Sequence, residues 1–427
     1  MKIYKNVIKN IGKGMFLTLL MVFVAFNSEV MAQEDFVQYE GKVIDVRTNS
    51  TLPSVNILVK GTNISTITNS DGEYILKIPN SVSNAVLVVS NLGYLPAEIS
   101  AANLPKKKGK IELEAKITEL TEVNLTAFNS AEALVRAVFK DKAKNSLDES
   151  VLMTAFYRET IKKRNKNVSL TEAVVNLYKE PYNSSSKDIL ELHKARKSTD
   201  YKRLDTVALK LQGGPFSTLY LDIMKYPEYI FTDRSIGNYE FNFESPSTVN
   251  DRPVYVVAFQ QRDNLPPPAY DGKLYIDAET FALTSATYSM NLDNQRAASE
   301  LFVKKKPRDI NVYPTRANYK VNYREKNGKW YYSYGNVQLT FKVNKRRKLF
   351  NSVYSLSSEM AVTDWESNTN GFMARPKDRL KPTVIIADAV SGFSDPDFWG
   401  PYNVIEPEKS IEAAINKIKR KLKRDKS

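Results

Sequence analysis

Short segments of alternating apolar and polar residues, separated by turn-forming residues, run through residues 36–115. In one of them, alternate residues from Val55 to Val59 share a face at the two-residue period of a β-strand. Asp71-Gly72 indicates a hairpin turn, because Gly accepts a positive φ, and we interpret both residues as structural turn formers rather than ligand-binding residues. Seven such segments predict a small seven-stranded β-sandwich.

Glycines, an Asp-Gly pair and alternating apolar residues recur through this segment in a recognisable pattern. Its members are Gly41, Val43, Asp45, Pro53, Val55, Ile57, Val59, Gly61, Thr68, Asp71, Gly72, Tyr74, Gly93 and Tyr94. The pattern resembles the carboxypeptidase-regulatory-like domain, a transthyretin-like sandwich. The resemblance implies a non-catalytic accessory module, of the kind found beside metallocarboxypeptidase domains and at the N-termini of Gram-negative outer-membrane receptors for glycan uptake.

The chain has no cysteine and a single histidine, His193. A metallocarboxypeptidase needs two histidines and a glutamate around its zinc, so this sequence excludes that activity. Thiol nucleophiles, disulfides and thiolate metal sites are excluded as well. No phosphate-binding loop or nucleophile elbow is present, and we interpret Trp330, Trp365 and Trp399 as core residues rather than sugar-stacking residues. We therefore expect no catalytic residue, metal or cofactor.

The N-terminus has the composition of an export signal. Four lysines precede an apolar stretch from Met15 to Phe26, and Val30-Met31-Ala32 supplies a small residue for cleavage. Residues 1–32 are predicted to be a signal peptide that places the protein in the periplasm, in possible association with the outer membrane. Retention of the segment as an anchor is the alternative, and it too would place the remainder outside the cytoplasm.

Basic residues exceed acidic ones, with a formal net charge of +14 that falls to +11 without residues 1–32. Export excludes nucleic acid as the acidic partner. A C-terminal helix starting at Pro407 carries an apolar stripe that includes Ile411 and Ile415. The stripe predicts a docked helix or peripheral contact with an anionic membrane surface. The basic residues for that contact are Lys417, Lys419, Arg420, Lys421, Lys423 and Arg424.

A larger β domain is predicted over residues 149–365, after a linker and helix at 116–148 in which Ser130 caps the helix. A surface loop and the basic helix follow at 366–427. Long alternating aromatic segments predict one antiparallel sheet, whereas 187–198 and 216–224 look irregular or helical. The expected strands are 151–157, 168–178, 254–260, 273–276, 281–290, 312–323, 329–343 and 349–362.

The hairpin sequence of residues 272–283, Gly-Lys-Leu-Tyr-Ile-Asp-Ala-Glu-Thr-Phe-Ala-Leu, is similar to the central hairpin of lipoprotein-carrier-like folds. The whole arrangement, ending in the aromatic segment 397–403, also resembles uncharacterised exported proteins of glycan-degrading Gram-negative bacteria. Our leading hypothesis is a non-enzymatic envelope protein with a docking sandwich and a partner- or ligand-binding β domain. A lipid or lipoprotein carrier, which needs an apolar cavity, and an envelope glycan hydrolase, which needs two convergent carboxylates, are the alternatives.

Overall fold

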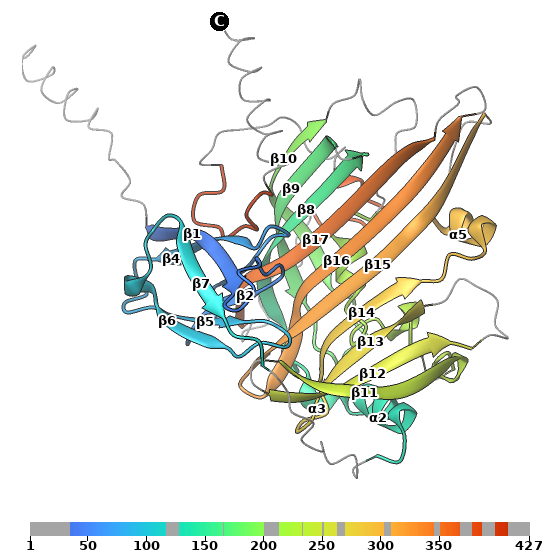
Figure 1. The fold of residues 1–427 in the computed structure, drawn as a ribbon, viewed down its shortest axis with the longest axis horizontal. Coiled ribbons are helices and arrows are strands. Elements are labelled where there is room, and N and C mark those ends of the chain that lie inside the picture. The colour runs from blue at the N-terminus through green and yellow to red at the C-terminus, as the bar shows by residue number, and fades with distance from the viewer. Residues whose placement is uncertain are drawn as a thin grey trace, which may run out of the picture.

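The computed structural model describes residues 35–116, 128–164, 166–199, 213–232, 234–249, 252–262, 270–302, 309–345, 351–367, 378–386 and 398–408. The predicted mainly β architecture is confirmed, with a small sandwich, a linking helix and a large antiparallel sheet (Figure 1). The predicted signal peptide and the C-terminal helix from residue 409 onward lie outside the described residues.

The N-terminal sandwich has seven strands, the predicted number, arranged in two sheets; the segment 36–45 forms one strand rather than two, and Ser65–Ile67 adds a strand that was not predicted. One has the order β4–β1–β7, in which β1 is antiparallel to β4 and parallel to β7, and the other has the order β3–β2–β5–β6. Alternate apolar side chains such as Ile57, Val59 and Leu76 are fully buried between them. The elements are β1 (Phe36–Asp45), β2 (Asn56–Val59), β3 (Ser65–Ile67), β4 (Glu73–Pro79), β5 (Val86–Ser90), β6 (Ala97–Ser100), η1 (Ala101–Asn103) and β7 (Gly109–Leu113).

A ten-stranded antiparallel sheet forms the rest of the framework. Its order is β10–β9–β8–β17–β16–β15–β14–β13–β12–β11, so β17, the last strand in the described residues, pairs with β8, which comes first along the chain in this sheet. The strands are β8 (Val151–Lys163), β9 (Lys166–Lys179), β10 (Ile189–Thr199), β11 (Tyr239–Val249), β12 (Arg252–Gln261), β13 (Tyr270–Asp277), β14 (Leu283–Met290), β15 (Ile310–Lys326), β16 (Lys329–Lys345) and β17 (Ser352–Ser367).

Two strands of this sheet were not expected from the sequence, and both lie at its edges. The segment 187–198 was predicted to be irregular or helical, which is wrong, because it contains β10. A register shift between Leu192 and Lys194, at His193, interrupts the alternation that would have revealed the strand. In β11 only Tyr239 and Thr248 are fully buried, so its apolar pattern is weak. Edge strands bury less of their surface and therefore carry less periodic signal.

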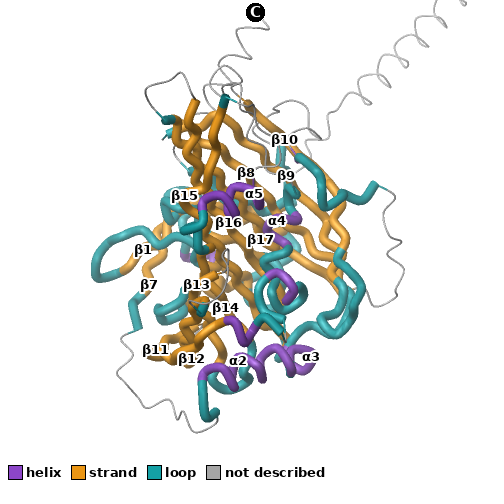
Figure 2. The backbone as a smooth tube through the Cα atoms, turned by 90° about the vertical axis from the view of Figure 1, so that its right-hand side faces the viewer, coloured by secondary structure: helices purple, strands orange, loops and turns teal. Residues whose placement is uncertain are grey.

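Helices and irregular segments cover one face of the large sheet. They are α2 (Ala131–Lys140), α3 (Lys142–Asn145), α4 (Phe216–Leu219), η3 (Pro227–Tyr229), η4 (Ile236–Asn238) and α5 (Gln295–Phe302). Figure 2 looks onto this face, with the helices in front of the strands. As predicted, Ser130 caps α2, with its Oγ accepting the N–H of Ala133, and the buried face of the helix includes Leu134 and Val138. This apolar face is filled by the chain's own side chains.

One ion network is sealed inside this apolar layer. The Lys179 ammonium lies 2.7 Å from Asp188 and 2.8 Å from Asp222, and all three side chains are fully buried. Tyr182 and Tyr323 also donate hydrogen bonds to Asp222. Burial alone would lower the pKa of Lys179, but the two carboxylates outweigh it and raise that pKa. The network joins β9 to the helical layer and to β15, and we interpret it as structural.

Candidate ligand-binding site

A continuous row of register-paired residues crosses the other face of the ten-stranded sheet. Each residue is the cross-strand partner of the next, so one residue from every strand lies along a single line. From β10 to β11 the row reads Arg196, Glu172, Arg158, Glu359, Asn336, Lys320, Thr287, Lys273, Ala258 and Asn242. Charges alternate over the first four strands, whereas the centre of the row is uncharged apart from lysine.

The charged end of the row is a buried Arg-Glu-Arg cluster. Arg158 donates from Nε and Nη2 to one oxygen of Glu172, at 2.8 and 2.7 Å, and Arg196 binds the other oxygen at 2.7 Å. Glu172 is fully buried. Burial alone would raise the pKa of Glu172, but the two guanidinium groups outweigh it and lower that pKa. Each arginine thus contacts one carboxylate oxygen with two nitrogens, so both oxygens of the buried charge have cationic partners.

Residues 398–408, which we call the strap, lie against this cluster. The guanidinium of Arg158 donates to the carbonyls of Ile405 and Glu406, at 2.6 and 3.2 Å. Trp399 packs edge-on to Phe156, with ring centroids 5.5 Å apart, and its ring lies 4.9 Å from the Arg196 guanidinium. The cluster therefore holds the strap on the polar face of the sheet.

The strap also binds the sandwich. Asn403 pairs with the backbone of Lys77 on β4, accepting its N–H at 2.6 Å and donating to its carbonyl at 3.0 Å. Thr66 and Asn69 donate to the strap carbonyls of Val404 and Glu406. The strap thus links the first domain to the second through hydrogen bonds on both sides.

Direct contacts complete the junction between the sandwich and the sheet. Ser65 donates to the carbonyl of Val362 at 3.1 Å, and Lys326 donates to the side chain of Asn63 at 2.6 Å. Ile67 shares a buried apolar cluster with Phe156 and other residues of the sheet and strap. The two domains are therefore joined by a packed, hydrogen-bonded interface.

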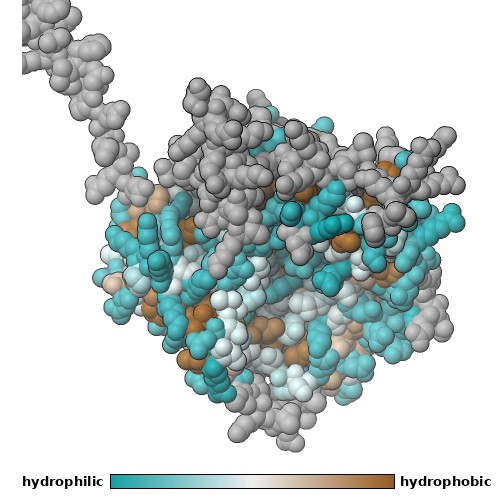
Figure 3. All heavy atoms as spheres, turned by 45° about the horizontal axis from the view of Figure 1, so that its top comes forward, coloured by the Kyte–Doolittle hydropathy of each residue, from teal (hydrophilic) through white to brown (hydrophobic). Residues whose placement is uncertain are grey.

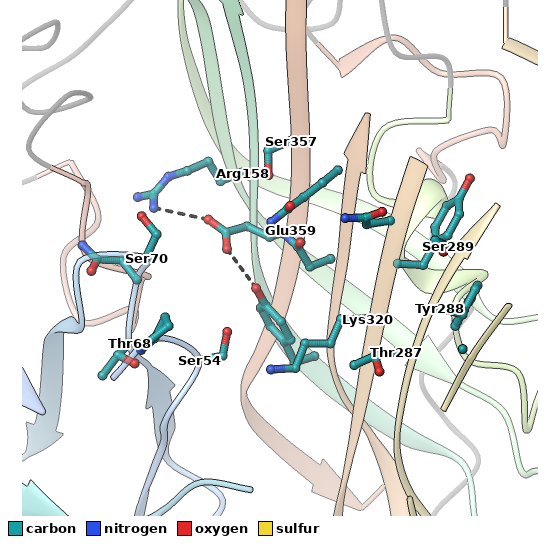
Figure 4. A pocket seen from close by; sticks show the side chains of 18 of the residues that line it. Ser54, Thr68, Ser70, Arg158, Thr287, Tyr288, Ser289, Lys320, Ser357 and Glu359 are labelled. Atoms are coloured by element: carbon teal, nitrogen blue, oxygen red, sulfur yellow. Dashed lines mark hydrogen bonds and ion pairs between the residues drawn. The ribbon is translucent and has the colours of Figure 1, made fainter. Parts of the chain in front are cut away.

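A cavity of about 620 Å³ opens beside this junction. Its walls come from the sandwich, from six strands of the sheet and from the strap. Figure 3 shows a hollow between the two parts, bordered largely by hydrophilic and intermediate side chains, and Figure 4 shows its lining from close by. The lining residues include Ser54, Thr68, Asn69 and Ser70 of the sandwich, Arg158, Asp271, Lys273, Thr287, Ser289, Asn318, Lys320, Asn336, Gln338, Ser357 and Glu359 of the sheet, and Glu408 of the strap.

Two of the carboxylates that line the cavity have cationic partners. Glu359 lies 3.5 Å from Nη1 of Arg158 and accepts a hydrogen bond from Tyr334 at 3.2 Å. Burial raises the pKa of Glu359, and the charge of Arg158 partly opposes this. Glu408 pairs with Lys162 at 3.0 Å. These two acids are therefore held in fixed positions by the framework.

The apolar face of the same strand β8 buries a different acid, Glu159, which is 3% exposed. Tyr157 donates to its carboxylate at 3.0 Å, and Ser358 donates to Tyr157 at 2.9 Å. Burial raises the pKa of Glu159 to about 7, and the hydrogen bond from Tyr157 opposes this. Glu159 is consequently protonated in the folded protein in mildly acidic solution.

Glu159→Gln is expected to change the pH dependence of folding. The pKa of a glutamate in the unfolded chain is about 4.3, and that of Glu159 in the folded protein is about 7. Between these two pH values the native state holds one more proton than the unfolded state. The free energy of unfolding of the wild type therefore falls as the pH rises through this window. Glutamine cannot ionise, so the variant should gain up to about 3 kcal/mol over wild type at pH 8 and nothing at pH 4. Urea unfolding at both pH values measures this. Parallel pH profiles of the two proteins would contradict it.

None of the candidate site residues singled out from the sequence is among the lining residues of the cavity, and some lie outside the described part. Asp71 and Gly72 lie in the turn between β3 and β4, where Gly72 has φ +72° and its N–H donates to the Asn69 carbonyl at 3.0 Å. His193 is exposed, and its Nε2 lies 2.7 Å from the Tyr402 hydroxyl of the strap. Trp330, Trp365 and Trp399 are buried. The basic residues Lys417, Lys419, Arg420, Lys421, Lys423 and Arg424 lie outside the described residues.

Sequence reasoning missed the charged residues of the row. Arg158 and Glu172 each interrupt a strand that is otherwise rich in buried apolar residues, and such an interruption is a usable signal of a buried ion pair. Lys320 gave no such signal, because it is one of many lysines in polar, aromatic strands.

The part of the chain that the structure describes contains no helix long and apolar enough to cross a membrane. It also contains no group of three or more His, Cys, Asp and Glu side chains placed to hold a metal ion.

A family model described as a CarboxypepD_reg-like domain matches residues 39–125. These residues belong to the CarboxypepD_reg-like domain family. The resemblance expected from the glycine and Asp-Gly pattern is thereby confirmed. The CarboxypepD_reg-like domain contributes Ser54, Thr68, Asn69 and Ser70 to the cavity. The family match ends before α2, so the other lining residues of the cavity, in the sheet and the strap, lie outside the matched segment.

A curated relative of this chain is TonB-dependent receptor P3 of Formosa agariphila. It is 31% identical over 112 residues, which is 26% of this chain and 11% of the receptor. This chain therefore spans about a tenth of the length of that relative.

Three solved structures are similar to more than half of the chain, at low scores. They are a DUF1329 family protein from Desulfovibrio piger (9% identity, 57% of this chain and 95% of that chain, TM-score 0.24), a putative outer membrane lipoprotein-sorting protein domain from Vibrio parahaemolyticus (9%, 56% and 93%, 0.25) and lipovitellin (7%, 55% and 27%, 0.27). Scores this low do not establish a shared fold.

Proposed function

We propose that this chain is a non-enzymatic protein of the cell envelope that binds a polar ligand between its CarboxypepD_reg-like domain and its large sheet. The observation that carries the proposal is the cavity of about 620 Å³, because its walls come from both parts and the strap holds the two together. Volumes of this size suit a small molecule. The predicted export signal and the similarity to part of a TonB-dependent receptor support the envelope location.

The side chains around the cavity favour a hydroxyl-rich ligand over an apolar one. Serine, threonine, asparagine and glutamine hydroxyls and amides line it, and these groups exchange hydrogen bonds with hydroxyls. The apolar face of the sheet, where a carrier would hold acyl chains, is packed with the chain's own side chains. Lipid carriage and contact of the basic tail with an anionic membrane remain predictions from the sequence.

Binding without chemistry is favoured by the way the acids are engaged. Glu359 is held by Arg158 and Tyr334, and Glu408 is held by Lys162. The one histidine lies against the strap, at an exposed position outside the cavity lining. A glycan hydrolase would need a free acid and a second convergent carboxylate. Asp271 is the cavity carboxylate to substitute when hydrolysis is assayed.

Filling the cavity tests the proposal. Gln338 and Asn344 are both exposed and on the same face of β16, but only Gln338 lines the cavity. A panel of soluble neutral and uronate oligosaccharides is tested, and at least one of them should raise the Tm of wild type and of Asn344→Trp. Gln338→Trp should bind that oligosaccharide at least tenfold more weakly. Thermal shift, then calorimetry on the member found, provides the measurement.

Three outcomes would argue against the proposal. Equal affinity in Gln338→Trp would place the ligand elsewhere. Shorter products after incubation, lost in Asp271→Asn, would favour the hydrolase. Acyl lipid that copurifies in native mass spectrometry, with no response to any saccharide, would favour the carrier.

A further inference from the structure

The cavity contains one cation without a partner. Three basic residues line it, and two of these are neutralised: Arg158 by Glu172 and Glu359, and Lys273 by Glu244 at 2.6 Å. Among the residues that the structure describes, the ammonium of Lys320 has no ion pair and no hydrogen bond. Lys320 therefore differs from the other cations of the row.

Lys320 also lies at the centre of the site. Its cross-strand neighbours are Asn336 on β16 and Thr287 on β14, both uncharged. Its side chain extends from β15 toward the sandwich loop that carries Ser54 (Figure 4). Burial lowers the pKa of Lys320, and no carboxylate opposes the shift. A half-buried ammonium without a counter-charge destabilises the folded protein, and a bound anion would offset this cost.

We propose that Lys320 binds the anionic substituent of a hydroxyl-rich ligand, namely a saccharide that carries one carboxylate, sulfate or phosphate group. This inference rests on the proposed function and names the ligand class. Asn336 and Thr287 flank Lys320 on the neighbouring strands, and both line the cavity, where they hydrogen-bond the hydroxyls of the sugar.

The acidic side chains of the cavity limit the ligand to low charge. Asp271, Glu359 and Glu408 also line it, so the formal charges of its walls balance before a ligand binds. A polyanion would meet these carboxylates, whereas a single anionic group can be placed at Lys320 with hydroxyls toward the acids. The site therefore selects a saccharide with one charge over a densely charged polymer.

Four disaccharides that differ only at one carbon provide the test. They are cellobiose, cellobiouronate, cellobiose 6-sulfate and cellobiose 6-phosphate. In calorimetry at neutral pH, at least one anionic form should bind wild type about tenfold or more tightly than cellobiose, since a charge-assisted hydrogen bond is worth about that factor. The form with the highest affinity identifies the anionic group.

Substitutions at Lys320 then assign the effect. Lys320→Met should remove the preference for the anionic form while leaving the affinity for cellobiose unchanged, and Lys320→Arg should retain it. Lys342→Met, at an exposed lysine on the same face of β16, is the matched control for loss of one charge and should behave like wild type. Lys320→Met should also melt no lower than wild type without ligand, because it removes an unpaired, desolvated ammonium.

Three results would overturn the inference, and they are distinguishable. If cellobiose and its anionic forms bind wild type equally, the ligand class is wrong and the cavity remains a saccharide site. If Lys320→Met keeps the preference, the anionic group is bound elsewhere and the assignment of Lys320 is wrong. If none of the four binds to wild type, the inference fails together with saccharide binding in the cavity.

Discussion

Glu172→Gln is expected to lower the free energy of unfolding by about 3–5 kcal/mol, because it leaves the guanidinium groups of Arg158 and Arg196 buried without their carboxylate. Glutamine keeps the shape of the side chain, so the loss reports charge rather than packing. Urea unfolding at pH 7 measures it. The matched control is Glu112→Gln, whose carboxylate pairs with Lys110 on the sandwich surface and should cost less than about 1 kcal/mol.

The effect of Glu172→Gln should depend on pH with a defined sign. The pKa of Glu172 is lowered in the folded protein, so its ionised form stabilises the fold above the unfolded pKa of about 4.3, and this stabilisation is lost as the pH falls through the folded value. The deficit of the variant should therefore be full at pH 7 and smaller in strong acid. A deficit below about 1 kcal/mol at pH 7 would show that the cluster is not needed for stability.

Removal of residues 398–427 is expected to destabilise the protein by on the order of 5 kcal/mol or more. Trp399, Val404 and Ile405 are buried, and each contributes about 1.5–3 kcal/mol through burial. Arg158 would also lose two carbonyl acceptors while it remains buried. Without the strap, the sandwich and the sheet should unfold in separate calorimetric transitions rather than together.

Removal of residues 409–427 alone is the control for this truncation. It keeps the whole strap, so the main transition should stay close to that of the full chain. One unchanged transition in the longer truncation would mean that the direct contacts of Ser65 and Lys326 suffice to hold the two parts together.

The sequence predicted the interior strands of the sheet well and its edges poorly. Strands such as β15 and β16 have one face in the core, so their alternation is strong, whereas the bulge at His193 obscures β10. The site was harder to predict for a different reason. Arg158 and Lys320 belong to one row only because β17 pairs with β8, and that register is set by contacts between distant segments.

The strap shows the same limit. Phe398 and Trp399 are conspicuous aromatic residues, but the sequence does not indicate that Arg196 lies against their rings or that Lys77 donates to the carbonyl of Gly400. Local patterns reveal which residues are buried, and the pairing of charges across an interface depends on how whole domains dock. The candidate site consists almost entirely of such pairings.

The pairing of β8 with β17 determines when during folding the protein becomes able to bind a ligand. These strands begin at Val151 and Ser352, and the cavity also needs Glu408 of the strap. Closing so long a loop is entropically costly and slow, so the sandwich can form early while the sheet waits for its last strand. A chain that is still being synthesised, or one that lacks residues 398–427, therefore carries a folded first domain but an incomplete binding site.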